Sequence, residues 1–182
     1  YRARKSSYAL GYAAYEKWLI GESVADLGDK AGLKTDISSD TRQRFSGDDW
    51  LTFLKASKAC LGTDSGASVM DFDGRLQLEV DAYCAKHPTA SFEQVRSQFF
   101  ADQDGLISIQ VISPRIFEAA AMRTLLILYP GQYSGRLIPG RHYLVLNKDH
   151  SYFSDIVTFL RDPDKVDAMT KLTYEEVACS YE

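Results

Sequence analysis

The chain has 182 residues and a formal net charge of −4, from 21 basic and 25 acidic residues. Because 45% of the residues are hydrophobic and 25% are charged, the composition is that of an ordered globular protein, not of a disordered chain or a coiled coil. The acidic balance excludes general nucleic-acid binding, and no apolar run approaches the roughly 20 residues that span a bilayer. The length predicts a single domain over residues 1–182.

The number and spacing of the cysteines indicate whether the protein works in a reducing or an oxidising compartment. Cys60, Cys84 and Cys179 form an odd set without a CxxC pair, which favours reduced thiols and gives no support to a disulfide framework or a zinc site. The sequence opens at Tyr1 without a methionine or a signal-like segment, so it is either a processed product or, as we prefer, a piece of a longer polypeptide. We expect a cytoplasmic protein with no transmembrane segment.

The first third of the chain predicts alternating helices and strands. Ile20, Val24 and Leu27 repeat at helical spacing, and Gly32 is typical of a C-terminal cap, so a helix is expected over residues 15–32. The next expected elements are a short strand at 33–38, a helix that begins near Trp50 and buries Trp50, Phe53 and Leu54, a strand at Ala59–Gly62, and a loop at 63–68.

The rest of the chain continues this alternation. Two helices, at 76–86 and 91–100, are interpreted as a helical insertion at about residues 75–104. Ser113 and Pro114 predict the N-cap and first residue of a helix. The other expected elements are strands at 106–112, 125–129 and 143–146, and helices at 115–122, 153–160 and 164–178. This order predicts an α/β fold, with parallel strands and helices on both faces of the sheet.

In such a sheet, ligands bind beyond the carboxyl ends of the strands, so the loops after Gly62, Ile112 and Tyr129 are the expected site. The sequence Ser113-Pro114-Arg115 places a hydroxyl, free backbone N–H groups and a guanidinium at a helix N-terminus, which suits a phosphate. Glu118, one turn later, can accept hydrogen bonds from a ribose diol. The alternative is that Ser113 is only a cap, Arg115 a surface ion-pair partner and Glu118 a helix-face charge.

Basic residues near the start, Arg2, Arg4, Lys5 and Lys17, are either a solvated surface or a diphosphate contact. The same two interpretations apply to Arg136 and Arg141. Other patterns predict no site. The loop at 64–68 matches neither common phosphate-binding glycine motif, residues 71–74 lack the ligands of a calcium loop, and the three histidines, His87, His142 and His150, are isolated from one another.

The most specific pattern covers residues 113–124, which read SPRIFEAAAMRT. This string resembles the R-x-F-E-x-x-A signature of bacterial glycosyltransferases with two Rossmann-like domains, the GT-B fold of the group 1 type. Downstream, residues 137–143, LIPGRHY, resemble the pattern of the CgeB-like branch. The resemblance spans nearly the whole chain, including upstream segments at 16–17, 50–54 and 61–68.

The resemblance implies a Rossmann-like three-layer α/β/α domain with a mainly parallel sheet, equivalent to the C-terminal, donor-binding half of a GT-B enzyme. The implied function is transfer of a sugar from a nucleotide-diphosphate sugar to an unknown acceptor, whether glycan, lipid or protein. Such enzymes generally need no metal, and we expect no cofactor. Without the preceding domain, the isolated chain is expected to be inactive. The alternative is a non-catalytic nucleotide-binding or interaction module.

The resemblance also implies roles for individual residues. Glu118 matches the glutamate that holds the nucleotide ribose, and Arg115 and Ser113 match positions that face the diphosphate. Arg115 and Glu118 are therefore the implied catalytic residues. Lys17 is a further candidate for the diphosphate.

Two further positions concern the donor. Backbone N–H groups near Ser65 and Gly66 are expected to complete the phosphate cradle together with those near Ser113. Many retaining members carry a second glutamate eight positions before the first. Gln110 stands at that position here, so this role is absent or filled differently, and the stereochemistry of transfer stays open.

Overall fold

The computed structural model describes residues 1–64, 66–107 and 111–180. Its helices and strands are, in chain order, α1 (Tyr12–Lys30), α2 (Asp48–Ala56), β1 (Ala59–Gly62), α3 (Arg75–Lys86), α4 (Phe92–Phe99), α5 (Pro114–Ala121), β2 (Leu125–Leu128), β3 (Leu144–Val145), α6 (Phe153–Leu160) and α7 (Pro163–Thr173). Short turns of 3₁₀ helix, η1 (Tyr8–Leu10), η2 (Thr41–Gln43) and η3 (Tyr133–Gly135), and a π-helical turn, η4 (Tyr174–Ala178), complete the described elements.

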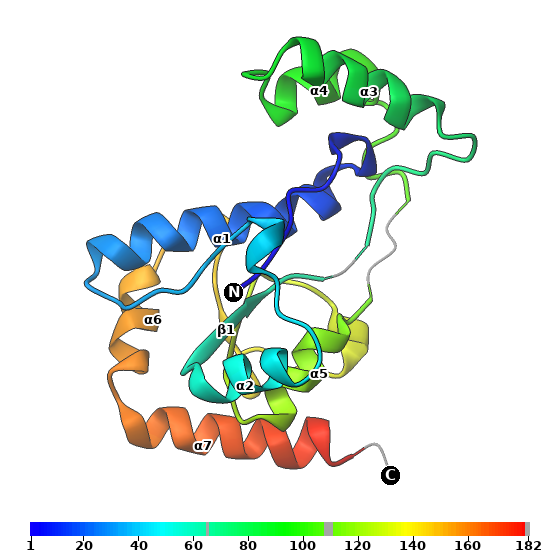
Figure 1. Ribbon diagram of the computed structural model, residues 1–182. Helices are drawn as coiled ribbons and strands as arrows, with labels where there is room; N and C mark the ends of the chain where they lie inside the picture. Colours follow the sequence, from blue (N-terminus) through cyan, green and yellow to red (C-terminus); the bar gives the residue numbers. More distant parts are fainter. Residues whose placement is uncertain (65, 108–110, 181–182) are drawn as a thin grey trace.

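The strands form a parallel sheet in the order β1-β2-β3 (Figure 1). In the register, Cys60 is the partner of Leu126, and Ile127 is the partner of Leu144. Parallel neighbours need a crossover connection, and α5 lies in the crossover from β1 to β2. The predicted α/β class with parallel strands is therefore confirmed, and the sheet is consistent with a Rossmann-like fold.

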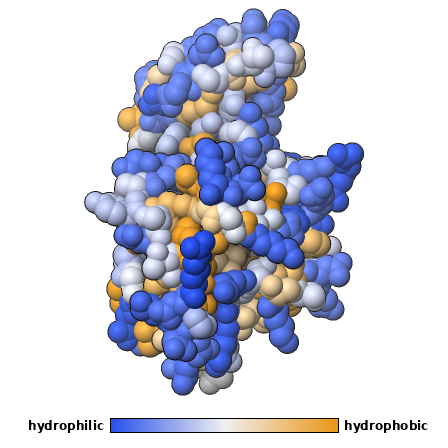
Figure 2. All heavy atoms as spheres, turned by 90° about the vertical axis from the view of Figure 1, so that its left-hand side faces the viewer, coloured by the Kyte–Doolittle hydropathy of each residue, from blue (hydrophilic) through white to orange (hydrophobic). Residues whose placement is uncertain are grey.

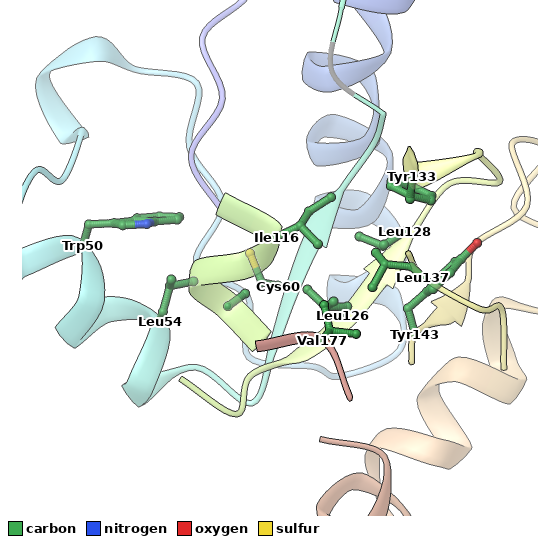
Figure 3. Packing of buried hydrophobic residues seen from close by; sticks show 11 residues of the cluster. Trp50, Leu54, Cys60, Ile116, Leu126, Leu128, Tyr133, Leu137, Tyr143 and Val177 are labelled. Carbon is green, nitrogen blue, oxygen red and sulfur yellow. The ribbon is translucent and has the colours of Figure 1, made fainter. Parts of the chain in front are cut away.

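Successive residues of β2 enter two different hydrophobic clusters. Leu126 and Leu128 pack with Trp50, Leu54 and other residues of α2 and α5, and Figure 3 shows Trp50 and Leu54 pointing from α2 towards α5. Ile127 instead belongs to a cluster built largely by α1 and α6, which contains Ile20, Val24, Phe153, Ile156 and Val157. Since each residue of β2 is buried, its sequence is a continuous apolar run without polar alternation.

Helix α1 ends as predicted and begins three residues earlier than predicted. Gly32 has φ +67°, its N–H donates to the Asp29 carbonyl, and the Leu33 N–H donates to the Gly28 carbonyl. These two bonds form a Schellman motif, which is why the helix stops there. At the other end, the Tyr12 N–H donates to Asp104 Oδ1 over 3.1 Å. Because this cap comes from a residue distant in the sequence, local periodicity did not reveal it.

The predicted strand at 33–38 is wrong. Within it, Ser38 makes a single isolated bridge to Arg2, and the rest is irregular. The Arg2 guanidinium explains the path, because it donates to the Asp36 carboxylate and carbonyl and to the Gln43 carbonyl. These bonds hold residues 36–43 against the N-terminal segment, although the two segments do not pair as strands of a sheet.

Other boundaries also differ from expectation. Residues 108–110 of the predicted strand at 106–112 lie outside the described residues, and Leu106 lies in a turn. The strand expected at 143–146 is reduced to β3, because Tyr143 instead forms an isolated bridge with Pro139. The C-terminal helix expected at 164–178 is α7 up to Thr173 and a π-helical turn beyond it.

The two predicted helices are confirmed as α3 and α4, and they form a lobe that stands apart from the sheet in Figure 1. The space-filling view in Figure 2 shows the molecule extended at the same end. The lobe packs on η1 and the start of α1 through an aromatic cluster in which Phe92 stacks on Tyr15, with ring centroids 4.5 Å apart. Ser91 and Gln94 form a capping box at the start of α4. Asp71 accepts hydrogen bonds from the Gly74 and Gln77 N–H groups, so it caps α3.

Three findings concern membrane-spanning helices, metal ligands and thiols. No helix in the described residues is long and apolar enough to cross a membrane. No group of three or more potential metal ligands occurs among residues 1–64, 66–107 and 111–180. Cys60, Cys84 and Cys179 are free thiols, as their spacing predicted, and burial raises the pKa of Cys60 to about 11.

Glu176 links the π-helical turn to the loop before β3. Its carboxylate accepts hydrogen bonds from Arg141 and from His142 Nε2, the latter over 2.8 Å, and these bonds lower its pKa from 4.5 to about 2. His142 Nδ1 accepts from the Ile138 N–H, so the proton is on Nε2. The carboxylate form of Glu176 therefore stabilises the folded chain.

This arrangement predicts a pH dependence. A lowered folded-state pKa gives a stabilisation that is complete above about pH 4.5 and is lost as the pH falls through about 2. We expect the urea midpoint of the wild type to exceed that of Glu176→Gln at pH 6, and the difference to shrink as the pH falls towards 2. A difference that does not change between pH 6 and pH 2 would contradict this linkage.

Candidate functional site

A pocket of about 390 Å³ lies beyond the carboxyl end of β1 and against the N-terminal end of α5. Gly62 and Thr63 contribute from β1 and its loop, and Ser113, Arg115 and Ile116 contribute from the start of α5. The opposite walls come from the N-terminal segment, α1, the segment before α2 and α2 itself: Tyr1, Arg2, Ala3, Arg4, Ser6, Lys17, Ser38, Ser39, Asp40, Arg44 and Trp50. The end of β1 and the start of α5 therefore bring two of the three predicted loops to one cavity.

The third predicted loop, after Tyr129, does not line the pocket but adjoins it through Asp64. This carboxylate, just past the end of β1, accepts hydrogen bonds from the Gln132 and Tyr133 N–H groups over 2.9 and 3.1 Å. Asp64 is thus occupied in fixing the loop after β2, and it is not among the residues that line the pocket.

Positive side chains dominate the pocket lining. Among the described residues, five cationic side chains line it and Asp40 is the one carboxylate: Arg2, Arg4, Lys17, Arg44 and Arg115. Asp40 is already engaged, because it accepts from the backbone N–H and the guanidinium of Arg42, which lowers its pKa. Such a lining attracts an anion with more than one negative charge.

Lys17 and Arg115 are the central cations. Lys17 is partly buried, and burial together with the neighbouring charge of Arg115 lowers the pKa of its ammonium. No acceptor for Lys17 Nζ is found among the residues that the structure describes. Two cations held close without a carboxylate between them repel each other, and a bound polyanion would offset that repulsion.

Arg2, in contrast, is structural. Its side chain is 7% exposed, it pairs with Asp36, and its guanidinium lies over the rings of both Phe45 and Phe53, 4.8 and 4.9 Å from their centroids. It thereby ties the segment before α2 to the N-terminal segment. The Arg2 carbonyl also accepts a hydrogen bond from Arg115 Nη1 over 2.6 Å, so Arg2 helps to place Arg115.

The start of α5 provides the second source of positive potential. Ser113 is the N-cap and Pro114 the first helical residue, as predicted, and the Ser113 hydroxyl makes no capping bond within the helix. The N–H of Ile116 donates back to the Ser113 carbonyl. The Ser113 hydroxyl and the helix dipole are therefore available to an anion in the pocket.

Trp50 and Glu118 meet beside this helix start. Trp50 Nε1 donates to Glu118 Oε2 over 2.7 Å, and the Arg115 guanidinium lies over the Trp50 ring, 5.1 Å from its centroid. Trp50 is 8% exposed and lines the pocket. Glu118 itself does not line the pocket, so its placement against a ribose stays a prediction.

The predicted site residues are thus partly brought together. Lys17, Ser113 and Arg115 share the pocket, whereas Gly66 and Glu118 are not among its lining. Ser65 and Gln110 lie outside the described residues.

The other basic residues that the sequence offered as diphosphate contacts, Lys5, Arg136 and Arg141, do not line the pocket. Lys5 lies over the rings of Tyr8 and Trp18, and Arg141 pairs with Glu176. Sequence reasoning missed Arg44 and the role of Trp50. Trp50 fitted the buried stripe of α2, and no local signal distinguishes a core tryptophan from one that borders a cavity.

Comparison with known proteins gives no relative. The chain matches no family model, no curated protein and no solved structure. What the pocket can bind therefore follows from the chemistry of its own residues.

Proposed function

We propose that the pocket binds the diphosphate of a nucleotide sugar, and that the chain is the donor-binding domain of a glycosyltransferase. The observation that carries this proposal is the pair Lys17 and Arg115, two cations without an acidic partner among the described residues, at a helix start beyond the end of a parallel strand. Diphosphate is the leaving group of sugar transfer, and its charge grows as the bond to the sugar breaks.

The resemblance of residues 113–143 to GT-B glycosyltransferases supports the same function. Under this proposal the domain is the three-layer, C-terminal half of such an enzyme, and a preceding domain supplies the acceptor site. Arg115, Lys17 and Ser113 bind the diphosphate, and Glu118 accepts hydrogen bonds from the ribose. The positive charge needed at the leaving group comes from side chains and the dipole of α5, so no bound metal is required.

A thermal-shift panel tests the proposal. We expect one of UDP, GDP, ADP or CDP, or its sugar conjugate, to raise the melting temperature, because ligand that binds the native state stabilises it by mass action. The shift should persist in EDTA. Glu118→Ala should weaken this binding by about 1 to 3 kcal/mol, the cost of unpairing a charged hydrogen-bonding group.

Glu79→Ala is the matched control, since Glu79 is an exposed glutamate on α3 and lies outside the pocket lining. If no nucleotide in the panel raises the melting temperature, that result contradicts nucleotide binding by this chain. Binding of a nucleoside diphosphate without additional stabilisation by any sugar conjugate would favour the non-catalytic nucleotide-binding module.

A further inference from the structure

Trp50 lies at the centre of a stack that joins two walls of the pocket. The Arg115 guanidinium covers the ring of Trp50, and the ring of Phe53 stacks beside it at 5.7 Å with an interplanar angle of 27°. Phe53 in turn contacts the guanidinium of Arg2, which also lies over Phe45. The stack therefore runs from α5 through α2 to the segment before α2.

The two contacts of Trp50 with α5 are chemically distinct. The face of the indole attracts the Arg115 guanidinium, whose Nη1 is fixed by the Arg2 carbonyl. The edge of the indole donates its N–H to Glu118 Oε2. Arg115 and Glu118 are three residues apart on one helix, so they are neighbours on its surface, and a single side chain restrains both.

We propose that Trp50 is a positioning residue with two separable roles, an inference that rests on the proposed function. Its ring holds Arg115 in place for the diphosphate. Its N–H occupies one oxygen of Glu118 and so restrains the carboxylate that the proposed function assigns to the ribose. The two roles depend on different parts of the indole, which makes them separable by substitution.

Trp50→Phe keeps a ring for Arg115 and removes the N–H, whereas Trp50→Leu removes both. The probes are inorganic pyrophosphate, the four nucleoside diphosphates, and their 2′,3′-dideoxy forms, measured by calorimetry on the 182-residue chain. We expect Trp50→Phe to bind pyrophosphate as the wild type does, and to lose about tenfold in affinity for the ribonucleotide but not for the dideoxy form. Trp50→Leu should weaken all three.

A double substitution isolates the carboxylate. In a Glu118→Gln background, the effect of Trp50→Phe on the ribonucleotide should shrink, because contacting residues of one network are not additive. Trp18→Phe is the matched control, since Trp18 contacts Tyr15 and Lys5 and lies outside the pocket lining.

A merely structural role for Trp50 would lower affinity for all probes in one proportion in Trp50→Phe, and that result would overturn the assignment. An unchanged preference for ribonucleotide over dideoxynucleotide would overturn it as well. If Trp50→Leu does not fold, the ribonucleotide and dideoxynucleotide affinities of Trp50→Phe still test the proposal. If the wild type binds none of the probes, the proposed function itself fails, and the role of Trp50 fails with it.

Discussion

Lys17→Met is expected to weaken nucleoside diphosphate binding by about 1.5 to 3 kcal/mol, or roughly ten- to a hundredfold in Kd, without destabilising the fold. The loss follows from removal of one charge-assisted contact to phosphate. The fold should tolerate the change, because the ammonium is partly buried beside Arg115 and its pKa is lowered by both effects. Methionine keeps most of the apolar stem and relieves the repulsion. Calorimetry and thermal melting of the same samples measure both effects.

Lys30→Met is the matched control on the same helix. Lys30 is exposed, it pairs with Asp26 one turn earlier, and it does not line the pocket, so binding should be unchanged. Arg115→Met should weaken binding by at least as much as Lys17→Met. If Lys17→Met lowers the melting temperature and leaves the Kd unchanged, Lys17 is a structural residue and the diphosphate is not bound there.

Gly11→Ala is expected to lower the free energy of unfolding by about 4 kcal/mol, through backbone strain and overpacking together. Gly11 has φ +79° and ψ −174°, a conformation that is essentially restricted to glycine. A Cβ there would meet Ser68 Oγ, and would lie 2.7 Å from Asp104 Oδ1 and 2.9 Å from Val69 Cγ2. Urea denaturation measures the change.

The steric conflict matters because Asp104 and Ser68 cap α1. Asp104 is 3% exposed, pairs with Arg96 and accepts from the Ser68 hydroxyl over 2.6 Å, while the Ala13 N–H donates to Ser68 Oγ. The same contacts tie the lobe of α3 and α4 to α1. Displacing them should therefore affect both parts of the molecule.

Gly47→Ala separates the two causes. Gly47 also has a positive φ, +55°, but no atom lies within 4 Å of the Cβ that alanine would add. It should carry the backbone cost alone, about 2 kcal/mol. Equal losses for Gly11→Ala and Gly47→Ala would show that the contacts around Gly11 relax freely and that the network does not constrain the helix start.

The sequence by itself determined the elements that depend on neighbouring residues, such as helix caps and apolar runs. Ser113 and Pro114 start α5, Gly32 ends α1, and the apolar run of β2 is a buried parallel strand, because caps, helix-terminal glycines and strand burial depend on neighbouring residues. The expectation that a site lies beyond the strand ends also follows from the order of elements alone: the loop after Gly62 and the start of α5 line one pocket, although the loop after Tyr129 does not. Lys17 reaches the same pocket from α1, which that expectation did not include.

Only the tertiary structure decided what each charged or aromatic side chain does. In the sequence Arg2 is one more basic residue near the start, like Lys17 and Arg4. In the structure its guanidinium binds Asp36, Gln43 and two aromatic rings, all more than 30 residues away. Trp50 has the periodicity of a core residue, yet it borders the cavity and binds Glu118 across 68 positions of chain. Hydrogen bonds and stacking act over a few ångströms in space, so their partners are set by how distant segments pack, which no local pattern encodes.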